Sequence, residues 1–365
     1  MVARAAIPLV FVLSRWGFGG MERMTYEVAR RLDRARYRPI LCCLKSPREA
    51  DAGAAVGDYS GLLRSKWDVA VVRRLRDLLR KERAAAVFAL GSGDAAFWGR
   101  VAAKLSRLPA AWWIHSMRDN VGRLNRALLP WTDFVVALSP RHRRFVTEHL
   151  RVAPGKVEVV QNGVDWAEHQ AAHCRDEVRS ELGVSPEMTV IGTVGGLRPV
   201  KGYDVLIRAA ALLLPQRPSV RLAIVGDGEQ RGALTDLAVS EGVADRVLFL
   251  GARQDVPRLM SGFDVFVLSS HSEAFPISAL QAMAAGLPVV ATDVGCLSEI
   301  VEPEVTGLLV PPGRPEALSH ALDWLAQDRC LAREMGRRGS EVVREGFPIE
   351  KSVEQFQALA DRLLH

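Results

Sequence analysis

The chain has 365 residues, of which 48% are hydrophobic and 25% charged, with a formal net charge of +6. At this length, such a composition predicts an ordinary soluble, globular protein with two α/β domains rather than one. No apolar run approaches the roughly 20 residues that span a bilayer, which excludes a membrane-spanning helix at this stage.

The cysteines indicate the compartment. All five are scattered along the chain, and none forms a Cys-x-x-Cys pair, so we expect a reducing cytoplasm and no metal site. The apolar opening at residues 6–13 is similar to the core of a signal peptide. It runs into Ser14 and Arg15 without a small-residue cleavage pattern, and we therefore interpret it as a first buried strand.

The net charge conceals an asymmetry between the two halves of the chain. Residues 1–150 contain 27 Lys and Arg against 13 Asp and Glu, a balance of +14, whereas residues 151–365 contain 21 against 29, a balance of −8. A basic first half can attract an anionic partner, namely a lipid surface, a lipid-linked phosphate or a nucleic acid. The alternative is that these arginines lie on solvated helix faces and bind no partner.

Apolar runs and amphipathic stretches alternate along the first half of the chain. Such an alternation predicts βα units and a parallel sheet. Helical spacing covers residues 24–32 and 69–81, and the polar, Gly-rich residues 45–66 are expected to form a loop. The expected strands are residues 9–13, 39–44, 85–90, 110–115, 134–138 and 157–160.

Two stretches of the first half have the chemistry of a ligand site. Gly19 and Gly20 follow the first strand and precede a helix, and adjacent glycines let the backbone approach a ligand closely. A plain tight turn is the alternative. His115 ends its strand, and the ends of strands in an open parallel sheet are where ligands bind. A histidine hydrogen-bonded within its own loop is the alternative there.

The alternation restarts after a polar, turn-rich segment at residues 166–186, where we place the domain boundary. The last helices are expected between residue 315 and the end of the chain. The strands expected in this half are residues 189–194, 220–226, 246–251, 263–269, 289–292 and one more near 306–310.

The loop after the strand at 189–194 contains two cations three residues apart, Arg198 and Lys201. We expect them to converge on one point, where Arg can bond phosphate oxygens through two donors and Lys acts as a point charge. An ordinary basic loop is the alternative. After the next strand, Gly226 and Asp227 begin a Gly-x-Gly stretch that is only weakly similar to a dinucleotide fingerprint.

The segment at residues 269–299 contains the most informative pattern. Glu273 lies in a loop, and Pro276 opens the following helix, where its missing N–H costs nothing. The first N–H groups of that helix lie at the positive end of its dipole, which predicts an anion site. Glu273, together with Gln281 two turns further along the chain, would hold hydroxyl groups around a bound phosphate. The expected N–H donors belong to Phe275, Ile277 and Ser278.

Together these stretches resemble the family 4 retaining glycosyltransferases of GT-B fold, also described as glycosyl transferases group 1. The donor-site signature of that family is Glu-x7-Glu. Glu273 matches the first glutamate, whereas the second position holds Gln281. The loop with Arg198 and Lys201 is similar to the family's Gly-Arg-Leu…Lys-Gly motif and has the family's spacing to Glu273. The resemblance is specific in the second half of the chain and loose in the first.

The resemblance implies a GT-B architecture, in which two doubly wound, Rossmann-like α/β domains face each other across a cleft. Residues 1–170 would form the acceptor-binding domain, with a C-terminal helix at about 347–365 that crosses back to it. Residues 171–346 would bind the nucleotide-sugar donor.

The resemblance also implies a role for each matching residue. Arg198 and Lys201 would neutralise the leaving diphosphate. Glu273 would hold the sugar hydroxyls, His115 would face the transferred sugar, and these four are the predicted catalytic residues. Gln281 would occupy the position at which the family has a glutamate that accepts hydrogen bonds from the ribose. The other expected donor contacts are Gly19 and Gly20 at the diphosphate, Gly226 and Asp227 near the nucleotide, the backbone of Arg253 at the nucleobase, and Phe275, Ile277 and Ser278 at the phosphates.

The expected function is a retaining, metal-independent transfer of a sugar from a UDP- or GDP-sugar, with no cofactor. The basic first half favours a lipid-linked glycan of envelope polysaccharide synthesis as acceptor, at an anionic membrane surface, and no nucleic-acid partner is expected. Two alternatives stay open: a GT-B-like nucleotide-sugar epimerase, and a non-catalytic nucleotide-sugar-binding protein, which Gln281 suggests. The sequence specifies neither the base and sugar nor the acceptor, the linkage or the oligomeric state.

Overall fold

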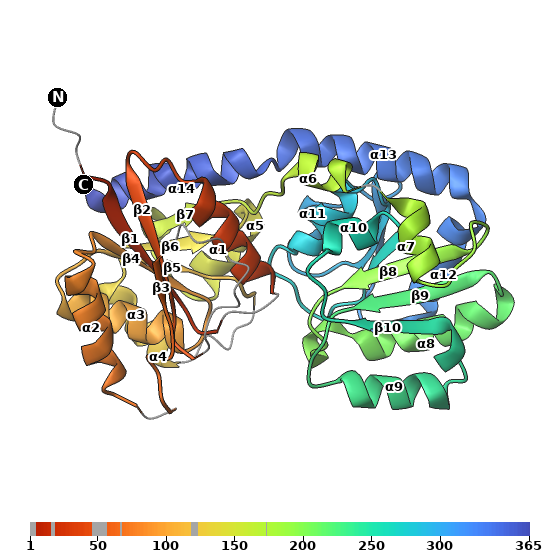
Figure 1. Cartoon of the computed structure of the whole chain (residues 1–365), viewed down its shortest axis with the longest axis horizontal. Coiled ribbons are helices and arrows are strands. Elements are labelled where there is room, and N and C mark those ends of the chain that lie inside the picture. The colour runs from red at the N-terminus through yellow and green to blue at the C-terminus, as the bar shows by residue number, and fades with distance from the viewer. Residues whose placement is uncertain (1–4, 16–18, 46–56, 66–67, 118–122, 173) are drawn as a thin grey trace. The chain divides into compact units, whose positions relative to one another are not determined.

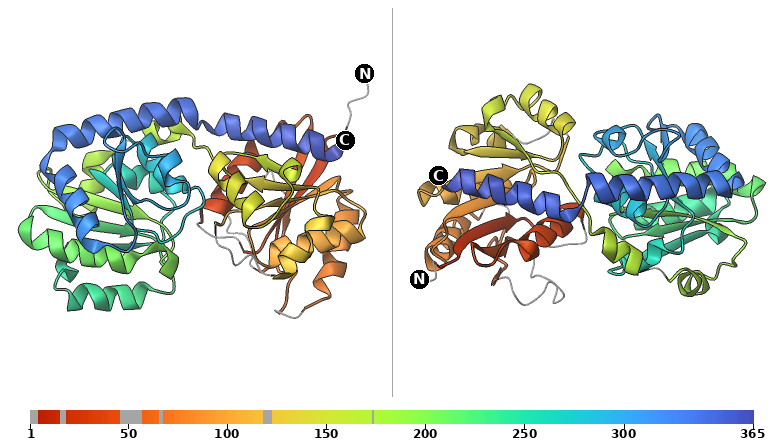
Figure 2. Two further views of the ribbon diagram at one scale, coloured as in Figure 1. Left: turned by 180° about the vertical axis from the view of Figure 1, so that it is seen from behind. Right: turned by 90° about the horizontal axis from the view of Figure 1, so that it is seen from above.

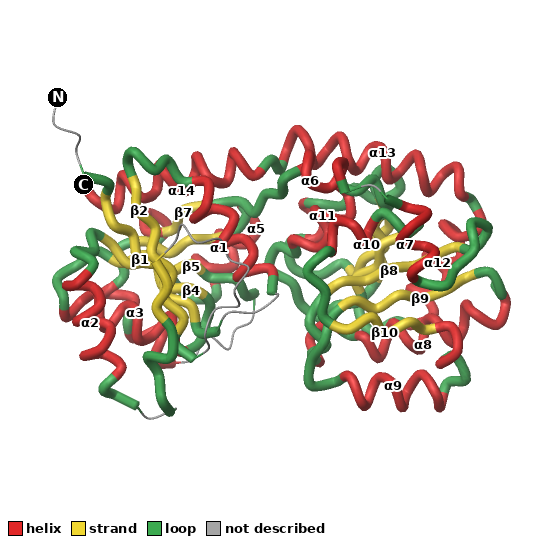
Figure 3. Tube along the Cα trace, viewed as in Figure 1, coloured by secondary structure: helices red, strands yellow, loops and turns green. Residues whose placement is uncertain are grey.

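The structure, a computed structural model, describes residues 5–15, 19–45, 57–65, 68–117, 123–172 and 174–365. The chain divides into two compact units, the first made of residues 1–162 and 349–365 and the second of residues 163–348. Each unit is a parallel sheet between layers of helices (Figures 1 and 3). This confirms the prediction of two doubly wound α/β units.

The first unit is built on a seven-stranded sheet in the order β3-β2-β1-β4-β5-β6-β7, in which every strand pair is parallel. The strands are β1 (Ile7–Leu13), β2 (Tyr37–Cys43), β3 (Gly57–Tyr59), β4 (Ala86–Leu90), β5 (Ala110–Trp113), β6 (Phe134–Ala137) and β7 (Val157–Val159). The helices are α1 (Gly20–Arg31), α2 (Val71–Lys81), α3 (Asp94–Leu105), α4 (Arg123–Ala127), α5 (Pro140–Glu148) and α14 (Ile349–Leu364), with 3-10 turns η1 (Leu129–Trp131) and η2 (Pro154–Lys156).

Both faces of this sheet are covered by helices, which is why β1, β4, β5 and β6 are apolar throughout rather than alternating. On one face, Val10 and Val12 of β1 pack with the buried residues of α2 and α3. On the other face, α14 lies beside α1 (Figure 2). There Phe356 of α14 contacts the rings of Phe11 and Phe88, with centroids 5.3 and 4.6 Å away. The C-terminal helix thus completes the core of the first unit.

The second unit has a six-stranded parallel sheet in the order β10-β9-β8-β11-β12-β13. Its strands are β8 (Thr189–Val194), β9 (Val220–Val225), β10 (Val247–Gly251), β11 (Val265–Leu268), β12 (Val289–Thr292) and β13 (Gly307–Val310). Its helices are α6 (Trp166–Ala171), α7 (Arg175–Glu181), α8 (Tyr203–Leu213), α9 (Arg231–Ser240), α10 (Val256–Met260), α11 (Ile277–Ala284), α12 (Pro315–Gln327) and α13 (Arg329–Gly346), with 3-10 turns η3 (Pro199–Lys201), η4 (Leu214–Gln216), η5 (Ala244–Arg246) and η6 (Leu297–Glu299).

Strand order changes direction between β8 and β11. From β8 the chain adds β9 and β10 on one side, and it then returns to place β11 on the other side of β8, followed by β12 and β13. In doubly wound sheets, ligands bind outside the carboxyl ends of the strands at such a switch point. A ligand site is therefore expected at the loops after β8 and β11.

Three expectations are corrected by the structure. The loop expected at residues 45–66 contains β3, which extends the edge of the sheet beside β2. Helix α1 begins at Gly20 rather than at residue 24, because Glu22 in its first turn suits a helix N-terminus. The segment at 166–186 is not irregular, since it contains α6 and α7.

We predict that Phe356→Ala lowers the free energy of unfolding of the first unit by about 3–5 kcal/mol, because a fully buried ring leaves a cavity among three aromatic neighbours. Hydrogen exchange followed by mass spectrometry would show faster exchange in β1 and β4 and little change in β8 and β11. Glu354→Ala, at an exposed position of the same helix, is the control. Equal acceleration in both units would contradict the assignment of α14 to the first core.

Candidate active site

Four loops meet at the carboxyl edge of the second sheet. The loop after β8 contains Arg198 and Lys201, the loop after β11 contains Glu273, and shorter loops follow β9 and β12. Lys201 donates from Nζ to Oε1 of Glu273 at 2.7 Å, forming an ion pair across the switch point. The Lys201 side chain is 19% exposed and that of Glu273 is 8% exposed. The structure thus brings together two of the predicted catalytic residues.

The Glu273 carboxylate is held by a second donor. The hydroxyl of Ser270 also donates to Oε1, at 2.7 Å. Ser270 is positioned in turn by the hydroxyl of Thr292, which is the last residue of β12 and donates to the Ser270 carbonyl at 2.6 Å. Because both donors converge on one oxygen, the position of the carboxylate is fixed by the two adjacent loops.

The loops after β8 and β11 are also joined by hydrogen bonds to backbone carbonyls. The Ser269 hydroxyl donates to the carbonyl of Lys201 at 3.0 Å, and the His271 N–H donates to the carbonyl of Val200 at 2.8 Å. These bonds fix the two loops to each other independently of the ion pair. The geometry of Lys201 and Glu273 is therefore built into the backbone.

Glycines allow the loops to approach this closely. Gly295, with φ +58°, lies against the loop after β11, and a Cβ there would come within 1.7 Å of the Glu273 carbonyl oxygen. Gly226 has φ +137°, and a Cβ there would lie 1.9 Å from the carbonyl oxygen of Gly195. Neither position can take another residue without moving the backbone.

Arg198 is exposed, and within the described ranges it makes no ion pair with a carboxylate. Its backbone N–H donates to the carbonyl of Gly196 at 2.8 Å, which bends the loop tightly. Nearby, the buried hydroxyl of Tyr203 donates to the Gly195 carbonyl at 3.1 Å, and burial raises the pKa of this hydroxyl far above its usual range. Tyr203 is thus an uncharged support of the loop.

Helix α11 begins one residue later than expected, because Pro276 is its N-cap and Ile277 its first residue. The first N–H groups of a helix have no acceptor within the helix, as the predicted anion site requires. Phe275 and Ile277 bury their side chains, and the Phe275 ring lies 5.8 Å from that of Phe347. Ser278 and Gln281 are half-buried, one turn apart on the same helix.

The side chain of Arg253 is occupied by an ion-pair network. Its guanidinium donates to both oxygens of Asp255 at 2.8 Å and to Glu181 of α7 at 2.8 Å. These bonds lower the pKa of Asp255 to about 2. These bonds use three of the five N–H donors of the guanidinium, and the backbone contact with the nucleobase stays a prediction. Asp227 is exposed after β9, and its carboxylate accepts a bond from the Gly228 N–H.

The remaining predicted residues belong to the first unit. Gly19 is the N-cap of α1 and Gly20 its first residue, directly after β1 and residues 16–18, which lie outside the described ranges. His115 follows β5, with its ring 5.3 Å from that of Trp113 and its Nε2 atom buried without a hydrogen-bond partner. Burial and the neighbouring His142 lower the pKa of His115 to about 3. His115 is therefore neutral at physiological pH.

Sequence reasoning missed the residues that support the site, namely Ser270, Thr292 and Gly295. No spacing rule connects them to Glu273, since their roles depend on how the loops after β11 and β12 pack. Among the described residues, no group of three or more His, Cys, Asp or Glu side chains could hold a metal ion. In the same part of the chain, no helix combines the length and apolar character needed to cross a membrane.

Solved structures share the fold of this chain. The chain superposes with a TM-score of 0.84 on the Anabaena Alr3699/HepE structure in complex with UDP-glucose, at 22% identity and over 98% of this chain and 100% of that one. It superposes with a TM-score of 0.78 on WaaG, a glycosyltransferase involved in lipopolysaccharide biosynthesis, at 19% identity and over 98% and 99% of the two chains. Their fold is the expected GT-B architecture.

The family follows from the sequence comparisons. Residues 18–168 match the model of Glycosyltransferase Family 4, and residues 175–342 match that of Glycosyl transferases group 1. The lipopolysaccharide core biosynthesis mannosyltransferase LpsB of Rhizobium meliloti is 30% identical over 68% of this chain and 71% of its own length. The chain therefore belongs to the family 4 glycosyltransferases, as the sequence predicted.

Other relatives are longer than this chain. The D-inositol 3-phosphate glycosyltransferase of Nocardia farcinica is 33% identical over 77% of this chain and 59% of its own length. The N-acetyl-alpha-D-glucosaminyl L-malate synthase of Bacillus anthracis is 30% identical over 66% of this chain and 62% of its own. The chain spans about half the length of several curated relatives that it matches.

We predict that Gly295→Ala disrupts the Glu273 loop far more than Gly286→Ala does. Both glycines have positive φ, but a Cβ at Gly286 meets nothing within 4 Å, whereas at Gly295 it overlaps a carbonyl oxygen. Gly286→Ala should cost about 1–2 kcal/mol from backbone strain alone, and Gly295→Ala clearly more. Chemical denaturation of both variants measures the difference. Equal losses would mean that the loops after β11 and β12 are not in contact.

Proposed function

We propose that the protein is a retaining glycosyltransferase that transfers a sugar from a UDP- or GDP-sugar to an acceptor hydroxyl without a metal ion. The observation that supports this most is the placement of Arg198, Lys201 and Glu273 at the switch point of the second sheet. Relatives with UDP or UDP-glucose in their solved structures support a nucleotide-sugar donor. Membership of a glycosyltransferase family favours transfer over the epimerase and the non-catalytic alternatives.

In the proposed reaction, the bond between the anomeric carbon and the diphosphate oxygen breaks, and its electron pair stays on the diphosphate. The acceptor oxygen bonds to the anomeric carbon from the same face, and its proton passes to the leaving phosphate oxygen. The negative charge that develops is stabilised by Arg198 and Lys201 and by the first N–H groups of α11. Fixed cations can supply this stabilisation in place of a metal ion.

The Lys201–Glu273 pair fits this role because each group keeps free bonding capacity. The Lys201 ammonium has three N–H donors and uses one on Glu273. Within the described part of the chain, Glu273 accepts its bonds from Lys201 and Ser270 on Oε1, which leaves Oε2 to accept from sugar hydroxyls. His115, which is neutral, and the backbone of Gly19 and Gly20 are the donor contacts that we propose from the first unit.

We propose an acceptor at a membrane surface, as in the assembly of envelope polysaccharides. The first unit has exposed cations on α2 and α5, among them Arg73, Arg80, Arg141, Arg143 and Arg144. Two relatives act in lipopolysaccharide synthesis by their names. Binding to anionic liposomes should weaken as salt rises, because exposed charges are screened. Binding that is weak and indifferent to salt would argue against a membrane acceptor.

We predict that one nucleoside diphosphate among UDP, GDP, ADP and dTDP raises the melting temperature, since a ligand that binds only the folded state stabilises it by mass action. Arg198→Ala should abolish this shift by removing a charge-assisted contact with the diphosphate. Arg333→Ala, an exposed arginine on α13, is the control. Absence of a shift with every nucleotide would contradict the donor site.

We predict that Gln281→Glu tightens binding of the nucleotide. A carboxylate accepts stronger hydrogen bonds from ribose hydroxyls than an amide does, by about 1 kcal/mol, which corresponds to roughly a fivefold lower Kd. Calorimetric titration of the two proteins with the nucleotide found above measures the effect. The substitution should lower the Kd of the corresponding nucleoside, which lacks the phosphates, by the same factor. Weaker binding by the variant would show that Gln281 does not contact the ribose.

A further inference from the structure

The first unit contains a buried histidine that the proposed reaction does not use. His142 lies in the first turn of α5, and its side chain is fully buried. Its backbone N–H donates to Oγ of Ser139, the N-cap of the helix, at 3.0 Å, so the start of the side chain is fixed by the helix. A buried polar side chain needs hydrogen-bond partners, and the partners of this ring show which parts of the chain it holds.

Both ring nitrogens of His142 have backbone partners. The N–H of Leu138, directly after β6, donates to Nδ1 at 3.1 Å. Nδ1 therefore has no proton, and in a neutral imidazole the proton is then on Nε2. Nε2 lies 3.2 Å from the carbonyl oxygen of Ser116 and donates to it. Burial lowers the pKa of His142 to about 4, so the ring keeps this neutral form at physiological pH.

The imidazole bridges the ends of two neighbouring strands. β5 and β6 are paired up to Trp113 and Val136, and the Ile114 N–H still donates to the Val136 carbonyl at 3.1 Å. Past this point the ring connects the Leu138 N–H to the Ser116 carbonyl. The chain after β5 is therefore held to the end of β6 beyond the paired residues of the sheet.

His115 lies between these two anchored points. The residue before it, Ile114, is bonded to β6, and the residue after it, Ser116, is bonded to His142. On one side the His115 ring contacts the ring of the fully buried Trp113, with centroids 5.3 Å apart. The direction of the His115 side chain therefore depends on the backbone bond that His142 makes.

We propose that His142 is a positioning residue, which holds the Ser116 carbonyl and thereby aims the His115 imidazole at the transferred sugar. This inference rests on the proposed function, in which His115 contacts that sugar. A group beside the reacting atoms loses much of its effect when it is displaced by about 1 Å, so the loop after β5 has to be fixed. His142 touches no substrate in this proposal, and it acts on the reaction only through the loop.

Two substitutions separate the two bonds of the ring. His142→Asn keeps an acceptor for the Leu138 N–H, so that α5 can still form, but its amide is too short to reach Ser116. His142→Gln brings an amide N–H to the position of Nε2 and can donate to the Ser116 carbonyl. The rate is measured as release of the nucleoside diphosphate from UDP-glucose or GDP-mannose, with water as the acceptor.

We expect His142→Asn to lower kcat by about 10- to 100-fold and to leave the Kd of the free nucleoside diphosphate, which lacks the sugar, unchanged. His142→Gln should retain most of the rate. His149→Asn, at an exposed histidine where the same helix ends, is the control. In a His115→Ala background, His142→Asn should lower kcat by no more than about twofold, because the group that it positions is gone.

An equal loss with and without His115 would overturn the proposal and limit His142 to the stability of α5. A Gln variant as slow as the Asn variant would overturn it too, as would full activity in both.

A measurement without turnover separates this proposal from the proposed function. In nuclear magnetic resonance spectra of isotope-labelled histidine rings, His142→Asn should shift the ring nitrogen signals of His115, whereas His142→Gln and His149→Asn should leave them in place. Unchanged His115 signals in His142→Asn would overturn the positioning role. A wild-type protein that hydrolyses neither donor counts against the proposed function, and the His115 signals still decide the role of His142.

Discussion

The second unit is organised around the contact between Lys201 and Glu273, which are 72 residues apart in the sequence. The two meet because β8 and β11 are neighbours, while the strands between them in sequence lie on the far side of β8. A partly buried ion pair is costly to form, since the loss of hydration offsets much of the attraction. Replacing such a pair by well-packed apolar side chains is often neutral or stabilising. The presence of the pair at the switch point is therefore better explained by ligand binding than by stability.

The pair also explains how a charged site can exist without ligand. Lys201 and Glu273 neutralise each other, and Ser270 satisfies the carboxylate further. In the proposed complex, a phosphate oxygen and sugar hydroxyls would offer the same kinds of bonds. Neither group would then be left unpaired in either state, which keeps the desolvation cost of binding small. Arg198 is different, because it is exposed and has no such partner in the described chain.

The sequence alone predicted most strands and the charged residues of the site. It did not predict the residues that hold those charged side chains in place. Strands buried on both faces have long apolar runs, so β8 and β12 were predicted to the residue. The three residues of β3 have no such run, since this edge strand is held by backbone pairing with β2. Ser270 and Gly295 were missed because their roles come from contacts between loops. A pattern along the chain indicates which chemistry is present, and loop packing determines which atoms support it.

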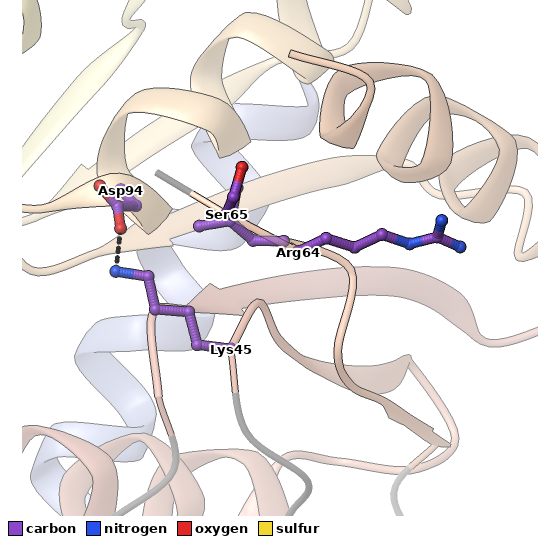
Figure 4. A pocket seen from close by; sticks show the side chains of 5 residues that line it. Lys45, Arg64, Ser65 and Asp94 are labelled. Atoms are coloured by element: carbon purple, nitrogen blue, oxygen red, sulfur yellow. Dashed lines mark ion pairs between the residues drawn. The ribbon is translucent and has the colours of Figure 1, made fainter. Parts of the chain in front are cut away.

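The two units hold the loops at the carboxyl edges of their sheets by different means. In the second unit, loops are pressed together at glycines such as Gly226 and Gly295, where a side chain would overlap a carbonyl oxygen. These two positions therefore tolerate no side chain without a shift of the backbone. In the first unit, backbone hydrogen bonds anchor the loops around a hollow (Figure 4), which is lined by the side chains of Lys45, Leu63, Arg64, Ser65 and Asp94. Those side chains can be replaced without moving the backbone.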